Sequence, residues 1–270
     1  MTSTSESPQP SKPETVAIVA HGRVDVGEAV DRVRRVAEQA GARVVDEPAG
    51  SDLTVAVGGD GTILRTLASL LGTKTPVIGV NFGRVGFLAS IEPDGLERDL
   101  ARVLAGEYRV LELPTLEVKL DGERHVAIND VVATSATLGR MVELAWSIGG
   151  EDLGIVPCDG IICSTPAGST AYNLSNGGPV LVRGLDAMAI TFIAPHSLDA
   201  RPLVVPRGAT VTVRNATADV SVGVLVDGHR VADMAPGAQI EISLGERRSL
   251  LAVLPETTFF RRYSQVFTGQ

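Results

Sequence analysis

The chain has 270 residues, 44% of them hydrophobic and 21% charged, which is the composition of an ordinary globular protein. Its net charge of −8, and arginine pairs that are scattered without interleaved aromatic residues, argue against a nucleic-acid or membrane-surface binder. No apolar stretch approaches the length of a membrane span. We therefore expect a soluble, cytoplasmic protein that binds neither nucleic acid nor membranes.

The first part of the chain alternates between strand-like and helical patterns. The opening residues, 1–13, are polar and contain proline, so they predict a disordered tail. After them, apolar runs ending in turn residues alternate with three-and-four apolar spacing, which predicts an α/β domain with a parallel sheet over residues 14–112. The strand-like runs are TVAIVA, ARVVDE, LTVAV and TPVIGV, and the helical spacings cover 26–40, 63–71 and 93–105.

From Tyr108 onward the pattern changes to short β-like runs separated by turn residues. This spacing predicts a mainly antiparallel β domain over residues 113–270. One segment, GSTAYNLSNGG, is typical of a brief helix or loop. The final 15 or so residues carry aromatic side chains at helical spacing, and we expect them to form a helix that packs by its apolar face, with docking back on the first domain as one option.

Two cysteines, Cys158 and Cys163, are too few and too close in sequence to indicate a disulfide framework. No histidine lies near them, so a zinc site is not expected. We interpret both as reduced, buried residues that pack like small apolar side chains.

The stretch DLTVAVGGDGTILRTLASLLG, residues 52–72, reads as a buried strand, a glycine turn and a helix. Such a junction gathers backbone N–H groups at a helix N-terminus and can bind phosphate. Gly58, Gly59 and Gly61 let a ligand approach the backbone closely. The pattern is neither a dinucleotide G-x-G-x-x-G fingerprint, because residue 64 is leucine, nor a Walker A loop, because the chain contains no Gly-Lys pair.

Asp60 is the unusual member of this turn, because phosphate repels a neighbouring carboxylate. Two chemical roles would explain it: holding Mg²⁺, or accepting the proton of an attacking hydroxyl. The alternative is a purely structural turn or helix cap, which aspartate often provides. The flanking glycines and the following helix favour a phosphate-handling site.

A second segment, CDGIICSTPAGSTAYNLSNGGPVL (158–181), is rich in Gly, Ser, Thr and Asn. Such loops surround polar ligands with hydroxyls and amides, although composition alone is equally typical of a plain surface loop. Ser169 does not match G-x-S-x-G and has no histidine near it in sequence, so a serine hydrolase is not expected.

Together with these two segments, the stretches PVIGVNFGRVGFLA, AINDVV, ARPLVVP and VDGHR resemble the NAD kinase family, in the order in which that family carries them. The resemblance implies a two-domain enzyme that transfers a phosphoryl group from ATP, or in some members from inorganic polyphosphate, to the 2′-hydroxyl of the adenosine ribose of NAD. No dedicated metal cage is visible in the sequence, so we expect Mg²⁺ to arrive with ATP, and we expect no tightly bound organic cofactor. Members of the family form homodimers or homotetramers, and we expect the same here.

The resemblance also implies roles for individual residues. Asp60 matches the proton acceptor, Asn129 and Asp130 match a pair that contacts the adenosine half of the substrate, and Asp159 begins the dinucleotide-binding loop. Further contacts with substrate are implied at Gly58, Gly59, Gly61, Arg65, Arg140, Thr170, Ala171, Tyr172, Asn173, Ser175 and His229.

Three positions depart from the family pattern. Asp130 stands where glutamate is more familiar, Pro157 stands where a basic residue is frequent, and Leu113 stands where arginine is frequent. A missing cation would weaken the binding of a pyrophosphate, by roughly 1–3 kcal/mol for a charge-assisted bond. Two alternatives therefore stay open: a kinase of the same fold with another nucleoside or nucleotide acceptor, and a dinucleotide sensor without catalysis.

Overall fold

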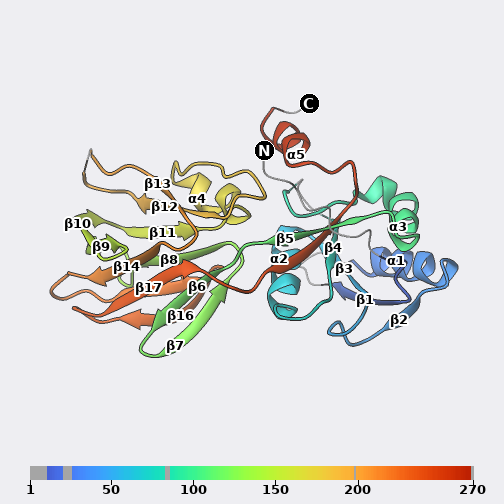
Figure 1. Cartoon of the computed structure of the whole chain (residues 1–270), viewed down its shortest axis with the longest axis horizontal. Coiled ribbons are helices and arrows are strands. Elements are labelled where there is room, and N and C mark those ends of the chain that lie inside the picture. The colour runs from blue at the N-terminus through green and yellow to red at the C-terminus, as the bar shows by residue number, and fades with distance from the viewer. Residues whose placement is uncertain (1–10, 21–25, 83–85, 198, 269–270) are drawn as a thin grey trace. The chain divides into compact units, whose positions relative to one another are not determined.

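A computed structural model describes residues 11–20, 26–82, 86–197 and 199–268 (Figure 1). Most of the expected tail, and part of the NFGRVGFLA stretch, therefore lie outside the described residues. The chain forms two compact units, Met1–Glu112 together with Ser249–Gln270, and Leu113–Arg248. No helix in the described ranges is both long and apolar enough to cross a membrane.

The first unit contains a six-stranded sheet in the order β2-β1-β3-β4-β18-β5. The pairs β1–β2, β1–β3, β3–β4 and β4–β18 are all parallel, which confirms the predicted α/β class. β3 is buried at every position, as expected of a central parallel strand covered on both faces. The bounds are β1 Thr15–Ala20, β2 Arg43–Val45, β3 Leu53–Gly58, β4 Val77–Asn81, β5 Arg109–Leu113 and β18 Ser249–Val253.

Helices α1, α2 and α3 of this unit bury the apolar stripes that their sequences predict. In α1, Val33 and Ala37 are fully buried in the core, and in α3 Leu96 and Leu100 join the same cluster. The bounds are α1 Gly27–Gln39, α2 Asp60–Ser69, the 3₁₀ turn η1 Pro93–Gly95, α3 Leu96–Leu104 and α5 Phe259–Phe267. The expectation that the C-terminal helix packs by its aromatic face was wrong, because Phe260, Tyr263 and Phe267 are exposed and the buried residue of α5 is Arg262.

The C-terminal segment from Ser249 belongs to the first unit, whereas the sequence assigned residues 113–270 to the second domain and allowed only the last 15 or so to dock on the first. β18 adds to the first sheet beside β4, with Leu251 opposite Val77 and Ala252 opposite Ile78. Its sequence, SLLAV, is a short apolar run that suits a buried strand in either sheet. Pattern alone could not choose between the two sheets.

The second unit consists of two six-stranded sheets, β10-β9-β14-β17-β6-β7 and β13-β12-β11-β8-β15-β16. Every described strand pair within them is antiparallel, which confirms the predicted class. The bounds are β6 Leu116–Leu120, β7 Glu123–Ala127, β8 Asp130–Ser135, β9 Val142–Ile148, β10 Glu151–Cys158, β11 Gly160–Ser164, β12 Ala187–Ile193, β13 Leu203–Pro206, β14 Thr210–Asn215, β15 Val222–Val226, β16 His229–Met234 and β17 Gln239–Leu244.

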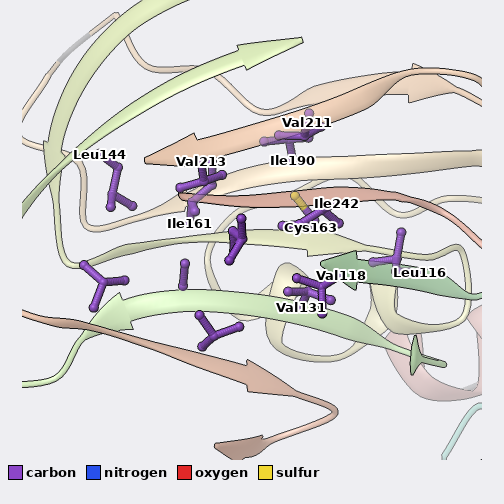
Figure 2. Close-up of a cluster of buried hydrophobic side chains, with 14 of the residues drawn as sticks. Leu116, Val118, Val131, Leu144, Ile161, Cys163, Ile190, Val211, Val213 and Ile242 are labelled. Atoms are coloured by element: carbon purple, nitrogen blue, oxygen red, sulfur yellow. The ribbon is translucent and has the colours of Figure 1, made fainter. Parts of the chain in front are cut away.

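The two sheets share one hydrophobic core. Figure 2 shows side chains from both, such as Val118 and Ile242 of one sheet and Val131 and Cys163 of the other, in a single cluster. Cys158 is also buried there, and both thiols are free, as expected. Burial raises the pKa of each thiol to about 12, so neither is poised to react at neutral pH.

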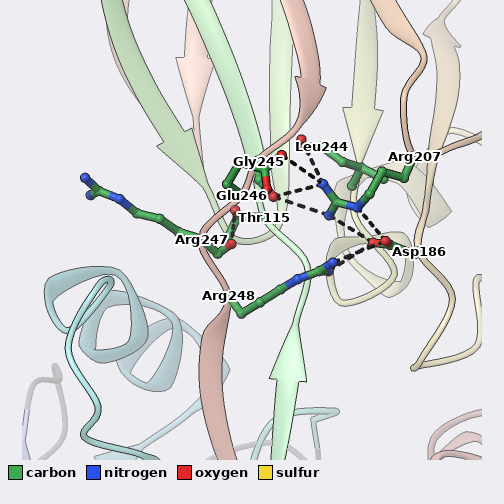
Figure 3. Close-up of polar contacts among 8 residues, drawn as sticks. All are labelled: Thr115, Asp186, Arg207, Leu244, Gly245, Glu246, Arg247 and Arg248. Atoms are coloured by element: carbon green, nitrogen blue, oxygen red, sulfur yellow. Dashed lines mark hydrogen bonds and ion pairs between the residues drawn. The ribbon is translucent and has the colours of Figure 1, made fainter.

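The end of the second unit is fixed by a polar cluster (Figure 3). The carboxylate of Asp186 accepts hydrogen bonds from Arg207 and, over 3.0 Å, from Arg248. The Thr115 hydroxyl donates to the carbonyl of Arg247 over 2.7 Å. The arginines hold the pKa of Asp186 at about 2, with Arg207 the larger influence. The residues just before the chain returns to the first unit are thereby anchored.

Candidate functional sites

The glycine turn lies where β3 ends and α2 begins, as predicted. Gly58 has a φ of +152°, which favours glycine, and Gly59 is the extended N-cap of the helix. The first N–H groups of a helix have no acceptor within it, and the helix dipole favours an anion there. A Cβ at Gly59 or Gly61 would meet no atom of a described residue within 4 Å, so the described part of the chain leaves space open beside this turn.

Asp60, the first residue of α2, has its carboxylate held by a distant segment. One oxygen accepts the N–H of Phe87 over 2.7 Å, and the other accepts the N–H of Leu88 over 3.1 Å. These donors lie 27 and 28 residues further along the chain. The carboxylate is therefore fixed in orientation, which a local turn or helix cap would not require.

Gly86 leaves the space that the Asp60 carboxylate occupies. A Cβ on Gly86 would lie 2.3–2.4 Å from the carboxylate atoms, which is closer than any real contact. Sequence reasoning matched NFGRVGFLA to the family but assigned no role to Gly86, Phe87 or Leu88. The repeated glycine in that stretch was the one available signal of a close approach. Arg65 lies on the same helix, one turn after Gly61, and its side chain is exposed.

In the second unit, Asp227 binds the backbone at the start of β8. Its carboxylate accepts the backbone N–H groups of Ile128, Asn129 and Asp130 over 2.8, 2.7 and 3.2 Å. Asp227 has a φ of +47° and is followed by Gly228 at +79°, the geometry of a tight Asp-Gly hairpin turn between β15 and β16. Sequence reasoning quoted this VDGHR stretch but gave Asp227 no function.

The predicted binding loop, within residues 158–181, is hydrogen-bonded to the backbone just before β8. The N–H of Thr165 donates to the carbonyl of Asn129 over 2.9 Å, and the Thr165 hydroxyl donates to the carbonyl of Ile128 over 2.6 Å. A Cβ on Gly168 would lie 2.1 Å from the Asn129 carbonyl oxygen, so only glycine permits this packing. The structure thus brings the loop and the Asn-Asp pair together.

Asn129 and Asp130 carry buried polar side chains, one without a hydrogen-bond donor among the described residues and one in a place that disfavours its charge. The side-chain oxygen of Asn129 is buried and accepts no hydrogen bond from any described residue. Asp130 is 6% exposed, and burial, followed by the charge of Asp227, raises its pKa to about 7. Burial also raises the pKa of Asp227, but the three N–H donors oppose that rise, so Asp227 has the better-stabilised carboxylate of this pair. A ligand that donates a hydrogen bond would satisfy Asn129.

The loop itself contains the 3₁₀ turn η2, Gly168–Thr170, and the short helix α4, Tyr172–Ser175. Tyr172 is 46% exposed, and Ser175 is also exposed, so both are accessible to a ligand. Asn173 is buried, and its amide group donates to the carbonyls of Ser169 and Pro179. Its side-chain oxygen accepts the Thr191 hydroxyl, so Asn173 organises the loop from within.

The remaining expected contacts of the loop are half-buried: Thr170 is the last residue of η2, and Ala171 lies between η2 and α4. His229 follows the Asp227 turn, is exposed, and places its Nδ1 3.1 Å from the Asp227 carbonyl.

Two expected contacts lie away from this point. Asp159 accepts the N–H of Ser135 through its carbonyl, at the other end of β8. Five residue steps along β8 amount to roughly 17 Å. Arg140 follows that same end of β8 and pairs with Asp219 over 2.9 Å. Within one chain, the structure therefore separates both residues from Asn129 and Asp130.

Leu113 and Pro157, two of the three positions that depart from the family pattern, have well-defined surroundings. Leu113 is buried in the hydrophobic core at the end of β5, where a charged side chain would be costly. Pro157 lies within β10, opposite Glu143, and its carbonyl accepts the N–H of His196.

Among the residues that the structure describes, no group of three or more His, Cys, Asp or Glu side chains could hold a metal ion. Asp60 is a single carboxylate, and its two oxygens already accept backbone N–H groups. The described residues therefore fit a metal that is bound mainly by a nucleotide's phosphates, with at most one carboxylate from the protein.

One site is a glycine turn with a fixed carboxylate at a helix N-terminus, and the other is a polar loop packed on an Asn-Asp pair. Both are compatible with an enzyme that handles phosphate and a polar ligand. Comparison with known families matches residues 26–108 to the ATP-NAD kinase N-terminal domain and residues 128–253 to the ATP-NAD kinase C-terminal domain. The NAD kinase of Heliobacterium modesticaldum is 38% identical over 243 residues, which cover 88% of this chain and 86% of that protein. The NAD kinase of Thermomicrobium roseum is 36% identical over 264 residues, covering 94% and 90%.

Solved structures agree in fold. An NAD kinase from Archaeoglobus fulgidus in complex with ATP matches with a TM-score of 0.77 at 27% identity, over 94% of this chain and 97% of that one. Yeast NADH kinase complexed with NADH matches in fold with a TM-score of 0.84 at 22% identity, over 95% and 88%. The chain belongs to the NAD kinase family.

Proposed function

We propose that the protein transfers the terminal phosphoryl group of ATP to the 2′-hydroxyl of the adenosine ribose of NAD, giving NADP and ADP. The hydroxyl oxygen forms a bond to the γ-phosphorus, and the bond from that phosphorus to the β–γ bridging oxygen breaks. Membership of the NAD kinase family supports the reaction. The observation that carries it is the Asp60 carboxylate, held in one orientation at the N-terminus of α2.

Asp60 accepts the proton that the hydroxyl loses. A proton acceptor must be within hydrogen-bond reach of its donor and correctly oriented. The amides of Phe87 and Leu88 provide the orientation, and each carboxylate oxygen keeps a further lone pair for the substrate. The glycine turn provides backbone N–H groups for phosphate and, with Arg65 one turn later, a cation for its charge.

Asn129 and Asp130 bind the adenosine part of the acceptor. The unsatisfied side-chain oxygen of Asn129 supports this role, since a donor from the nucleoside would complete it. A protonated Asp130 can donate to a ribose oxygen, and an ionised Asp130 can accept from a ribose hydroxyl. Contacts to the rest of the dinucleotide come from the loop side chains Thr170, Tyr172 and Ser175, with His229 at the neighbouring turn.

Mg²⁺ enters with ATP, because its usual ligands in kinases are phosphate oxygens and one or two carboxylates. When bound, it neutralises charge that develops on the transferred phosphoryl group. Polyphosphate in place of ATP, and NADH in place of NAD, are the corresponding alternatives for donor and acceptor.

The test compares NADP formation by the wild type and by Asp60→Asn, with NAD and Mg-ATP as substrates. Turnover that falls by several orders of magnitude in a folded variant supports the proposal. An active wild type with an equally active Asp60→Asn excludes Asp60 as the proton acceptor. A folded wild type that binds NAD without turnover indicates a dinucleotide sensor without catalysis. Turnover only with other nucleosides or mononucleotides indicates a kinase of the same fold with another acceptor.

A homodimer or homotetramer is the assembly we propose. Two strands at the edges of their sheets, β10 and β13, expose apolar side chains, namely Leu153, Ile155, Leu203 and Val204. Exposed apolar edge strands are surfaces that protein association covers. Light scattering coupled to size-exclusion chromatography measures the mass directly, and a monomer at micromolar concentration contradicts this assignment. Cytoplasmic location, and the lack of nucleic-acid and membrane partners, stay predictions from composition.

A further inference from the structure

Helix α5 buries an arginine while its aromatic side chains are partly exposed. Arg262 is 6% exposed and is the buried residue of this helix, whereas Phe260, Tyr263 and Phe267 are all exposed. A buried guanidinium is stable only when acceptors surround it. Its partners therefore indicate what the burial achieves.

Those partners lie in the segment 87–92. The first two residues of this segment, Phe87 and Leu88, donate their N–H groups to the Asp60 carboxylate. Arg262 donates to the carbonyl of Ala89 and, over 2.8 Å, to the carboxylate of Glu92. The other oxygen of Glu92 accepts the side-chain amide of Asn81, the last residue of β4, over 3.0 Å. The segment is thus joined to α5 at two points.

The same segment is fixed to the sheet and to the rings of α5. The N–H of Asn81 donates to the carbonyl of Ile91 over 2.8 Å. The ring of Phe87 lies 5.6 Å from that of Phe267 and 6.2 Å from that of Phe259, measured between centroids. Phe87 is also the residue whose N–H donates to Asp60 over 2.7 Å. A continuous set of contacts therefore leads from α5 to the carboxylate.

We infer that Arg262 is a positioning residue for Asp60 that acts through segment 87–92 and is not expected to touch substrate. The inference rests on the proposed function, in which Asp60 accepts the proton. Without Arg262, the carbonyl of Ala89 and the carboxylate of Glu92 lose their cation, and the segment that presents the two N–H groups gains freedom. Small misplacement of a reacting group is enough to slow a reaction greatly.

The first experiment measures steady-state kinetics of Arg262→Gln and of the matched control Arg261→Gln, which changes the adjacent, exposed arginine of the same helix. For Arg262→Gln we expect kcat to fall by roughly 10- to 100-fold, with KM for ATP and NAD within about twofold. Arg262→Lys should recover part of kcat, because it keeps a cation beside Glu92. Arg261→Gln should retain wild-type kinetics.

A double-mutant comparison separates positioning from simple stabilisation. In an Asp60→Asn background, Arg262→Gln should cause no further loss of residual rate, because the group that it positions is already gone. Its effect on the melting temperature should persist in that background. The same fold-loss of rate in both backgrounds, or an Arg262→Gln variant with wild-type kcat, would overturn the inference.

Amide hydrogen exchange at Phe87 and Leu88 provides a readout that does not depend on turnover. Arg262→Gln should accelerate exchange at both amides, and Arg261→Gln should not. If Arg262→Gln accelerates exchange but the wild type makes no NADP, Arg262 does restrain segment 87–92 and the proposed NAD kinase activity is rejected. If exchange is unchanged and the wild type is active, the restraint by Arg262 is rejected. If Arg262→Gln does not fold, Phe267→Ala, which removes a ring from Phe87, takes its place in the same assays with the same expected directions.

Discussion

The backbone N–H of Asn129 donates to the carboxylate of Asp227 over 2.7 Å, although 98 residues separate the two in the chain. Together with the neighbouring N–H groups of Ile128 and Asp130, this bond fixes the start of β8 from a hairpin turn in another part of the sequence. The backbone that carries the proposed adenosine contacts is thus set by a residue that need not touch the ligand.

Asp227→Asn should therefore weaken both folding and substrate binding. An amide presents one neutral oxygen and an NH₂ group, so at least one of the three backbone N–H groups loses its acceptor and the others lose a charged one, at a cost of roughly 1.5–3 kcal/mol in the free energy of unfolding. We expect a higher KM for NAD and a smaller change for ATP. Urea denaturation and steady-state kinetics measure these effects.

Asp121→Asn is the matched control for that change. Asp121 also precedes a glycine in a tight turn, between β6 and β7, with a φ of +49°, and it is exposed. It should alter neither quantity. Equal losses in the two variants would show that the turn, and not the bonds to β8, accounts for the effect of Asp227.

Asp130→Asn should change how stability depends on pH. Because burial raises the pKa of Asp130 to about 7, the folded protein binds this proton more tightly than the unfolded chain, whose pKa is about 4. The stability from this group is complete below about pH 4 and is lost as pH rises to about 7. Between about pH 4 and 7 the free energy of unfolding of the variant should rise relative to that of the wild type, by at most roughly 1.4 kcal/mol per unit of pKa shift. Above about pH 7 the difference between the two proteins should be constant. Urea denaturation from pH 4.5 to 8.5 measures it, and a pH-independent difference would contradict the assignment.

Gly86→Ala should displace the Asp60 carboxylate. The added methyl group would meet that carboxylate at 2.3–2.4 Å, so either the carboxylate or the segment must move. Overpacking of this kind typically costs about 1–3 kcal/mol, and we expect a lower melting temperature and a large loss of kcat. Gly61→Ala, where a methyl group meets nothing within 4 Å, is the control for melting temperature alone. Two variants of equal stability would argue against the close packing at Gly86.

Asp186→Asn should loosen the cluster that anchors the end of the second unit. Asp186 and its arginines are partly exposed, so screening limits the loss to about 1 kcal/mol at neutral pH. Because the pKa of Asp186 is lowered to about 2, its contribution is present above about pH 4 and disappears as pH falls toward 2. The variant and the wild type should therefore become more alike in urea denaturation at pH 3 than at pH 7. Asp233→Asn, which breaks one exposed ion pair with Arg230, should cost less.

Much of the site could be predicted because its signals are local. A buried strand, a glycine turn and an apolar helical pattern are contiguous around Asp60, and the β-like runs around Asn129 and Thr165 are equally compact. Phe87, Asp227 and Arg262 gave no such signal, because each acts on a residue far away in the chain. Arg262, for instance, reaches Glu92 across 170 residues.

The sequence by itself determined the two fold classes, the order of most elements and the position of the glycine-aspartate turn, because hydrophobic period and turn residues are properties of neighbours along the chain. Only the tertiary structure decided that β18 joins the first sheet, that Asp159 and Arg140 lie at the far end of β8, and that Asp60 is held by amides 27 and 28 residues away. Those facts depend on which surfaces meet when the chain folds, and an apolar run or a lone carboxylate is compatible with several partners until packing selects one.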